Sequence, residues 1–239
     1  MPLLTVFPMP RADRSAACAV MSPSFARLFI AVFSVLVTTL APLPAPGVSA
    51  AAASIAASGT ILVYGDSLSS AYGIAQDHGW VKLLETRLKG EKRNYSVANA
   101  SISGETTSGG LSRMKQALER HKPSITVIEL GANDGLRGLP VAEMRKNLET
   151  MIKMARTAGS RVVLVGVKMP PNYGADYNKA FDAAFRDLAK AHETGLVPFL
   201  FEGFADKREF YQSDNLHPNA AAQPILLENV WKALKPMLK

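Results

Sequence analysis

The sequence predicts an α/β fold in which helices cover both faces of a five-stranded parallel sheet. Two observations support this prediction. Five short apolar runs, each typical of a buried strand, alternate with longer stretches whose apolar residues recur at helical spacing. A loop rich in Gly, Asn, Ser or Asp lies beyond each run, and the functional residues of such sheets gather at the carboxyl ends of the strands.

The first half of the domain contains three of the predicted strands. Residues 60–65 (TILVYG) form an apolar run that ends at a glycine, so we expect a buried strand. Residues 80–89 (WVKLLETRLK) carry an apolar stripe at helical spacing and predict a helix. A strand at 95–100, a helix at 110–120 and a strand at 124–130, apolar apart from one glutamate, complete this half.

The second half continues the alternation, with helices expected at 140–159, 177–192 and 220–238 and strands at 161–167 and 196–201. Pro140 and Gly159 stand where helices prefer to begin and to end. Gly195 is expected to close the helix at 177–192. Pro198 has no N–H for a central ladder, so the fifth strand is expected at an edge of the sheet.

The chain is expected to divide into an N-terminal extension with a secretory signal peptide (1–50) and the folded domain (51–239). Residues 28–40 are uncharged and mostly apolar, and a small-residue cleavage site ends at Ala50. A helix over these residues would rise about 20 Å, less than the ~30 Å hydrocarbon core of a bilayer. We therefore expect cleavage near Ala50, a periplasmic or secreted protein, and no stable membrane anchor.

Two alternatives stay open at this end of the chain. The apolar segment could remain as an uncleaved membrane anchor. The initiator could be Met21 instead of Met1, because Met21 would start a more compact signal peptide.

The composition argues against several classes of function. The only cysteine, Cys18, precedes the apolar segment, so the domain has neither a disulfide nor a cysteine nucleophile. The net charge of +7 is not gathered into a basic run with interleaved aromatic residues, so nucleic acid is not expected as a partner. No His, Asp and Glu residues share metal-ligand spacing, so we expect no metal and no cofactor.

One histidine stands apart from the others. Asp214 precedes His217 by three residues, and Pro218 follows it, which favours an extended backbone and could start the final helix. A carboxylate in that place can accept the Nδ1–H bond and leave Nε2 free as a base. The alternative is that Asp214 serves only as a capping residue at the start of a helix. The other histidines are expected to be solvated or structural, in a loop or at helix C-termini: His78, His121 and His192.

Ser67 lies where the first strand ends, in the stretch GDSLS. A serine hydroxyl is a weak nucleophile without a base, and His217 could serve as that base. The oxyanion of an acyl-transfer intermediate needs hydrogen-bond donors, which the N–H groups of Ser67 and Gly104 and the amide of Asn133 could provide. The sequence thus offers each role of serine acyl transfer, although the common G-x-S-x-G motif is absent.

An acyl chain would need apolar surface beside Ser67. The loops 134–139 and 168–177 offer it, and these residues could equally pack the loops against each other. The candidate substrate-binding residues are Leu136, Met169, Pro170, Pro171 and Tyr173.

The sequence resembles the SGNH, or GDSL, hydrolase family through four blocks in order: GDSLS (65–69), Gly104 in SISGET, GAND (131–134) and DNLH (214–217). The similarity covers nearly all of residues 51–239. It is strongest to the bacterial thioesterase I, arylesterase and lysophospholipase branch.

The resemblance implies a flavodoxin-like three-layer α/β/α sandwich, with Ser67, Asp214 and His217 as the triad and Gly104 and Asn133 as oxyanion donors. It also implies hydrolysis of small acyl esters and thioesters, possibly of lysophospholipids, by a monomer without a metal. Activity is then expected to rise with pH as His217 loses its proton.

Three other functions remain as alternatives. A carbohydrate O-deacetylase of the same fold would act on acetyl groups alone. A flavin- or phosphate-binding protein could use the loop SISGETTSGG, although the phosphate loop of such a sheet should follow the first strand. A non-catalytic module would not react with serine-directed organophosphates.

Overall fold

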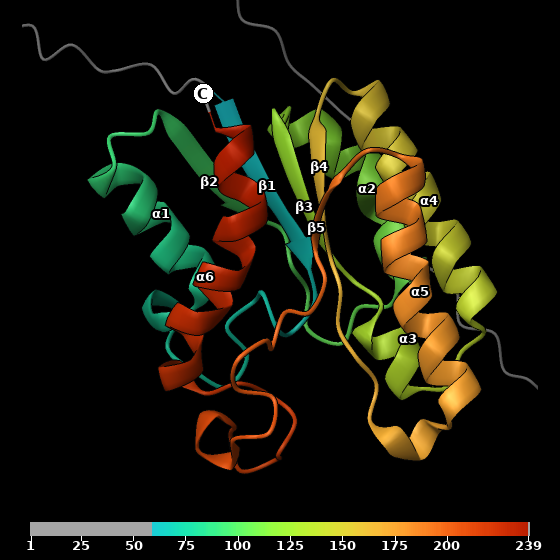
Figure 1. Ribbon diagram of the computed structural model, residues 1–239. Coiled ribbons are helices and arrows are strands. Elements are labelled where there is room, and N and C mark those ends of the chain that lie inside the picture. The colour runs from blue at the N-terminus through green and yellow to red at the C-terminus, as the bar shows by residue number, and fades with distance from the viewer. Residues whose placement is uncertain (1–58, 239) are drawn as a thin grey trace, which may run out of the picture. The chain divides into compact units, whose positions relative to one another are not determined.

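The computed structural model describes residues 59–238, which contain one sheet of five parallel strands in the order β2-β1-β3-β4-β5. The strands are β1 (Gly59–Gly65), β2 (Tyr95–Asn99), β3 (Ile125–Glu129), β4 (Arg161–Val165) and β5 (Gly195–Val197). This order is that of the flavodoxin-like fold, so the predicted α/β architecture is confirmed (Figure 1). The expected signal peptide, its cleavage site and the domain boundary after residue 50 lie outside the described residues.

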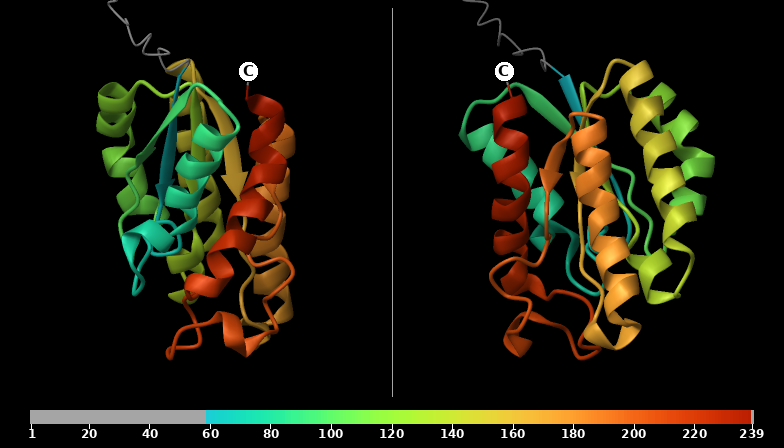
Figure 2. Two further views of the ribbon diagram at one scale, coloured as in Figure 1. Left: turned by 90° about the vertical axis from the view of Figure 1, so that its left-hand side faces the viewer. Right: turned by 45° about the vertical axis from the view of Figure 1, so that its right-hand side comes forward.

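Helices cover both faces of the sheet. They are α1 (Trp80–Gly90), α2 (Thr107–His121), α3 (Ala132–Leu136), α4 (Val141–Thr157), α5 (Ala175–Ala191) and α6 (Gln223–Leu234). One face carries α1 and α6, and the other carries α2, α4 and α5 (Figures 1 and 2). No helix within residues 59–238 combines the length and the apolar character needed to cross a bilayer.

The core forms because the central strands are apolar on both sides. In β1, the residues from Ile61 to Tyr64 are fully buried, and β1 pairs with β2 along one edge and with β3 along the other. The helices turn their apolar stripes onto these strands, as Leu148 does from α4 and Phe181 from α5. This two-sided burial makes β1 and β3 rigid supports for the loops that follow them.

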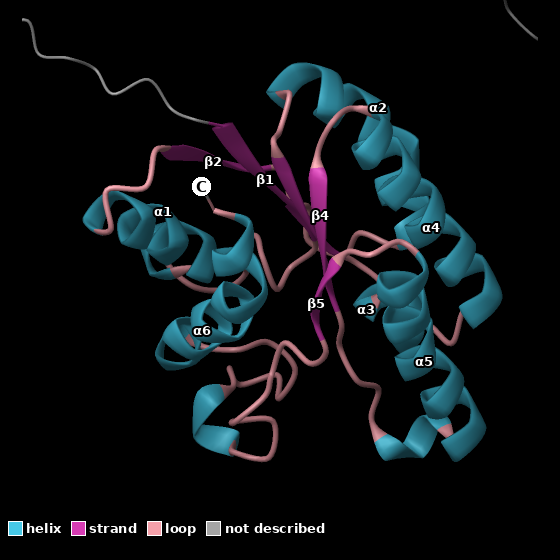
Figure 3. Ribbon diagram, turned by 45° about the horizontal axis from the view of Figure 1, so that its top comes forward, coloured by secondary structure: helices cyan, strands magenta, loops and turns pink. Residues whose placement is uncertain are grey.

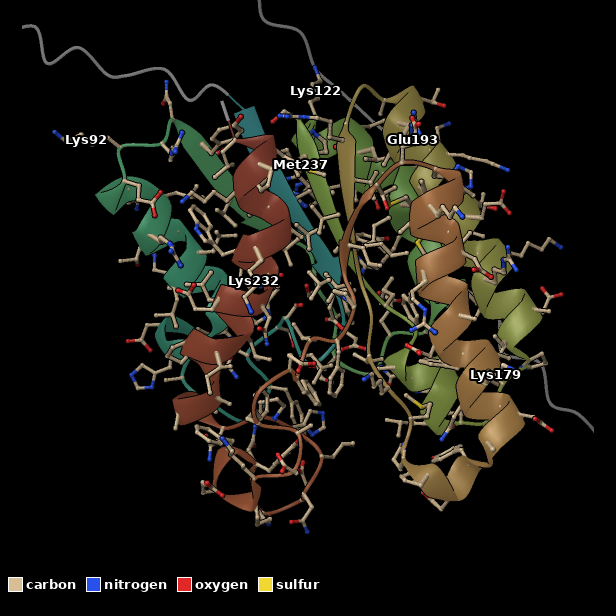
Figure 4. The ribbon with its side chains drawn as sticks, in the orientation of Figure 1. Lys92, Lys122, Lys179, Glu193, Lys232 and Met237 are labelled. Atoms are coloured by element: carbon tan, nitrogen blue, oxygen red, sulfur yellow. The ribbon has the colours of Figure 1, made fainter. Side chains whose placement is uncertain are left out.

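The sheet has short turns at one edge and long loops at the other. At the edge where the strands begin, three residues with a positive φ lie between a helix and the next strand: Lys92, Lys122 and Glu193 (Figure 4). Gly159 does the same after α4. The expectation that Gly195 closes α5 was wrong. The helix ends at Ala191 with His192 as its cap, and Gly195 is the first residue of β5.

The fifth strand is shorter than expected. It lies at an edge of the sheet, as predicted, but it ends at Val197 instead of residue 201. Pro198 explains the difference, because it cannot donate a ladder hydrogen bond. Phe199 and Phe201 consequently lie beyond the strand, in the loop that leads toward α6.

The last helix also differs from its prediction. Residues 220–238 form α6 with a 3₁₀ turn at each end, at Ala220–Ala222 and at Lys235–Met237. Pro218 does not start the helix, since it forms an isolated antiparallel bridge with Tyr211. Pro224 occupies the first turn of α6, where its missing N–H costs nothing.

Candidate active site

The long loops at the carboxyl ends of the strands surround a cavity of about 520 Å³. These loops gather at the bottom of Figure 1, and Figure 3 shows them from another side. The cavity lies within the usual size range of small-molecule sites. Ser67, Ala132 and Asn133 line it, so the ends of β1 and β3 open onto it.

Three side chains at this cavity form a chain of hydrogen-bonding contacts. Nε2 of His217 lies 3.0 Å from Oγ of Ser67, and Nδ1 of His217 lies 2.7 Å from Oδ2 of Asp214. The ring of Tyr72 packs against His217 with 4.6 Å between ring centroids. The structure thus brings together three residues that are 150 positions apart at their extremes in the chain.

The loop that carries His217 is held by its own hydrogen bonds. Oδ1 of Asp214 accepts from the N–H groups of Leu216 (2.9 Å) and His217 (3.0 Å), so one carboxylate fixes both the backbone and the ring. The N–H of Gln212 donates to the carbonyl of His217, and its side-chain amide donates to the carbonyl of Tyr72. The second contact ties this loop to the loop after β1.

Asp214 is ionised across the ordinary assay range. Hydrogen bonds from the Leu216 N–H, and from the ring and N–H of His217, lower the pKa of Asp214 to about 2. Its charge is therefore lost only as the pH falls toward that value. Changes in activity at higher pH must arise from other groups.

The turn that carries Ser67 is fixed on both sides of that residue. Oδ1 of Asp66 accepts from the N–H of Leu68 at 3.0 Å, and the indole N–H of Trp80 donates to the carbonyl of Leu68 at 3.1 Å. Oγ of Ser69 donates to Glu129 at 2.7 Å. Ser67 itself is only partly buried, so its hydroxyl stays accessible from the cavity while its neighbours are held.

Of the candidate oxyanion donors, Ser67 and Asn133 line the cavity, and Gly104 lies in the loop between β2 and α2. Within residues 59–238, the backbone N–H groups of Ser67 and Gly104 donate to no other protein group. Nδ2 of Asn133 donates to Oδ2 of Asp66 at 2.9 Å and to the carbonyl of Glu105 at 3.0 Å. Gly104 has a φ of 78°, which a residue with a side chain would adopt only under strain.

The short helix α3 places Asn133, and the sequence analysis did not predict it. Five residues are too few to show a helical period. Asp134, next along the helix, accepts from the N–H (2.8 Å) and the hydroxyl (2.6 Å) of Thr107 at the start of α2. This buried contact fixes α3 against α2 and so fixes the position of Asn133.

Two carboxyl groups lie buried directly behind the Ser67 turn. Asp66 is fully buried and Glu129, the last residue of β3, is 1% exposed. Burial raises the pKa of Asp66 to about 6, against the opposing effect of its hydrogen bonds from Leu68 and Asn133. Burial and the neighbouring charge of Asp66 raise the pKa of Glu129 well above its usual range.

Four of the five candidate substrate-binding residues line the cavity: Leu136, Met169, Pro170 and Pro171. Tyr173 is not among the residues that line the cavity, so its place in the acyl pocket stays a prediction. Its hydroxyl donates to the carbonyl of Leu136 at 2.8 Å, so it braces one wall from behind.

The sequence analysis did not identify a further part of the cavity lining. This part comes from the loops after β5: Phe199, Phe201, Asp206, Arg208, Tyr211 and Leu216. The apolar run that ends in Phe199 and Phe201 was the available signal, but it was assigned to the fifth strand. The remaining histidines lie away from this site: His78 is exposed in a 3₁₀ turn, and His121 and His192 end α2 and α5.

The chain is similar to known proteins in both sequence and fold. Residues 63–224 match the GDSL-like lipase/acylhydrolase family. The chain is 49% identical over 183 residues to esterase TesA of Pseudomonas aeruginosa. This match covers 77% of this chain and 91% of that protein. It is 37% identical to the thioesterase 1/protease 1/lysophospholipase L1 of Escherichia coli, over 77% of this chain and 86% of that one.

A solved structure shares the fold closely. The psychrotrophic esterase EstA from Pseudoalteromonas sp., in a structure inhibited by monoethylphosphonate, is 42% identical with a TM-score of 0.71. The match covers 74% of this chain and 97% of that one.

Proposed function

The chain belongs to the GDSL-like lipase/acylhydrolase family, and on that premise we propose that it is a serine acyl hydrolase. Its substrates would be small carboxylic esters, aryl or alkyl, and acyl thioesters, with lysophospholipids as a further class. The observation that carries this proposal is the contact chain Ser67–His217–Asp214, whose serine lines a largely apolar cavity. The relatives named esterase and thioesterase/lysophospholipase support the substrate classes.

In the proposed acylation step, Oγ of Ser67 attacks the acyl carbonyl carbon and its proton passes to Nε2 of His217. The carbonyl oxygen becomes an oxyanion, which accepts from the N–H groups of Ser67 and Gly104 and from the amide of Asn133. The tetrahedral intermediate then collapses. His217 gives its proton to the leaving alcohol or thiol, and the acyl group stays on Ser67 as an ester.

Deacylation repeats these steps with water. His217 takes a proton from a water molecule as that water attacks the acyl-Ser67 ester. The carboxylic acid leaves, and Ser67 recovers its proton. Asp214 keeps the proton of His217 on Nδ1 between steps and stabilises the imidazolium that forms. Every residue in this scheme comes from one chain, so the chemistry requires no second subunit. We propose that the enzyme acts as a monomer.

The test is hydrolysis of p-nitrophenyl esters from acetate to palmitate, with an acyl thioester in parallel and Ser67→Ala as the control. Turnover over several chain lengths that disappears in the variant supports the proposal. Turnover of acetate alone would favour the carbohydrate deacetylase. No turnover, and no covalent labelling by an organophosphonate, would contradict a serine hydrolase of any kind.

Leu136→Trp is expected to shorten the range of acyl chains. Leu136 lines the cavity, and a larger ring would fill space that a long chain needs. We expect kcat/KM for palmitate to fall by about 10- to 100-fold, while that for acetate changes little. The ratio of the two values over the ester series is the measurement.

Leu139→Trp is the matched control for this change. Leu139 follows α3, is 38% exposed and does not line the cavity. Its variant should keep the chain-length profile of the wild type. Equal losses in both variants would show that the bulky ring acts by disturbing α3 and its loop instead of by filling the acyl site.

We also propose that the enzyme is exported and then cleaved near Ala50. The support is the apolar segment 28–40 and the small residues before Ala51. The N-terminal sequence of the protein recovered from a periplasmic fraction should begin within a few residues of Ala51. Recovery of the uncleaved chain from membranes would favour the anchor instead.

A further inference from the structure

The buried carboxyl groups of Asp66 and Glu129 have no role in the acyl transfer described above, although they lie directly behind the turn that carries Ser67. Gly65 is the register partner of Glu129 across the β1–β3 pair. A Cβ atom on Gly65 would lie 2.6 Å from Oε2 of Glu129, so the glycine leaves room for this carboxyl group. Oε2 accepts from the N–H of Asp66 (3.3 Å) and from Oγ of Ser69 (2.7 Å).

Asp66 connects this buried group to the proposed oxyanion donor. One oxygen of Asp66 accepts from the N–H of Leu68, and the other accepts from Nδ2 of Asn133 at 2.9 Å. The same carboxylate therefore orients the turn of the nucleophile and the amide of Asn133. Both oxygens are occupied by donors, which is the arrangement that favours an ionised carboxylate.

We propose that Asp66 and Glu129 are a positioning pair, in which ionised Asp66 aims the Asn133 amide at the oxyanion and neutral Glu129 holds the Ser67 turn. The proposal rests on the function proposed above, because it assigns Asn133 to the oxyanion.

The hydrogen bonds of Asn133 show how the pair would work during a turnover. Its amide donates one bond to the Asp66 carboxylate and one to the neutral carbonyl of Glu105. Charge-assisted hydrogen bonds are about twice as strong as neutral ones. The bond to Glu105 should therefore yield to the oxyanion, while the bond to Asp66 keeps the amide in place.

The charges around the pair agree with one proton held on Glu129. Three ionisable groups act on Asp66: Glu129 at the end of β3, Asp134 in α3 and His217 in the loop before α6. Glu129 faces the charge of Asp66, and both burial and that charge favour the protonated form of Glu129. Two adjacent buried carboxylates would repel each other, so a single proton between them lowers the free energy of the folded state.

A double-mutant cycle between Asp66 and Asn133 tests the first half of the proposal. Asp66→Asn has one carbonyl oxygen for two donors, so either Leu68 or Asn133 would face an NH₂ group. Asn133→Ala is expected to lower kcat by about 10²- to 10³-fold. Asp66→Asn should lower kcat by about 10²-fold with little change in KM, because oxyanion donors act in the transition state.

In the Asn133→Ala background, Asp66→Asn should change kcat by less than about threefold, because Asp66 acts through Asn133. Losses that multiply in the double variant would overturn the positioning role. Wild-type kcat in Asp66→Asn would do the same. Wild-type kcat in Asn133→Ala would instead contradict the proposed function, so the two failures are distinguishable. Asp77→Asn, at an exposed site in a 3₁₀ turn, is the matched control and should leave kcat unchanged.

Glu129→Gln tests the second half. A glutamine carbonyl can accept from Ser69 and Asp66 as a neutral carboxyl does, so kcat should stay within about threefold of the wild type. The infrared spectrum of the wild type at pH 8 should contain the C=O band of a protonated carboxyl, and Glu129→Gln should lack it. A wild type without this band, or a band that persists in the variant, would overturn the assignment of the proton to Glu129.

Glu129→Gln should also differ from the wild type in the way its Tm changes with pH. A carboxyl whose pKa is raised by folding stabilises the protein below its unfolded-state pKa, and this contribution is lost as the pH rises through the folded value. Glu129→Gln removes that loss, so its Tm should gain on the wild type from pH 5 to pH 9. A constant difference in Tm over this range would contradict a raised pKa.

Discussion

Ser67→Ala is expected to lower kcat by roughly 10⁶-fold, as loss of the nucleophilic serine does in subtilisin. The change removes the proposed nucleophile, Oγ of Ser67, which lines the cavity and lies 3.0 Å from Nε2 of His217. The fold should survive, because the turn is held by Asp66, Leu68 and Ser69 and not by the Ser67 hydroxyl. The measurement is kcat on p-nitrophenyl butyrate with the melting temperature alongside.

Ser70→Ala is the matched control. Ser70 lies three residues further along the same loop, and its hydroxyl contacts that of Ser103 at 2.8 Å on the exposed side. Its variant should keep kcat within about twofold, and an organophosphonate should label it as it labels the wild type. If Ser67→Ala were still labelled, or kept more than a hundredth of the wild-type kcat, the nucleophile would have to be another residue.

The geometry of the candidate site could be predicted from the sequence because its residues lie where chain topology alone places them. Parallel strands bring their carboxyl ends to one edge, so Ser67 after β1, Gly104 after β2 and Asn133 after β3 had to lie near each other. Asp214 and His217 are three residues apart, and their contact is set by the local turn. Neither argument needs the packing of the core.

The walls of the cavity were less predictable. Phe199 and Phe201 belong to an apolar run that reads as a strand, and only the ladder itself shows that pairing stops at Val197. Tyr173 is an aromatic residue in a loop expected to line the pocket, but its hydroxyl donates to the carbonyl of Leu136 and it does not line the cavity. Such choices depend on three-dimensional hydrogen bonding, which a sequence pattern does not record.

The buried carboxyl pair lies between these two cases. Glu129 was visible as a single acid in an apolar strand, which is a costly place for a charge. The signal did not identify a partner, because the contact with Asp66 depends on the register between β1 and β3 and on the missing Cβ of Gly65.

Asp214→Asn is expected to lower kcat by about 10⁴-fold while the loop keeps its shape. The carbonyl oxygen of an asparagine can still accept from the N–H groups of Leu216 and His217, which Oδ1 of Asp214 does now. The NH₂ group would then replace Oδ2, which lies 2.7 Å from Nδ1 of His217. Two donors cannot pair, so the proton of His217 moves to Nε2, where it prevents the ring from accepting the proton of Ser67.

The titration of Asp214 itself should contribute nothing to the pH dependence of this loss between pH 5 and pH 9. The pKa of Asp214 is about 2, so the wild-type carboxylate is fully ionised over this range, and its titration cannot contribute to the profile. Glu209→Gln is the control, because Glu209 is an exposed acid of the same loop outside the cavity lining, and its variant should match the wild type. Suppose that the Asp214→Asn enzyme keeps a tenth or more of the wild-type kcat. This carboxylate would then contribute its hydrogen bonds to the backbone, and not the proper tautomer and charge stabilisation of His217.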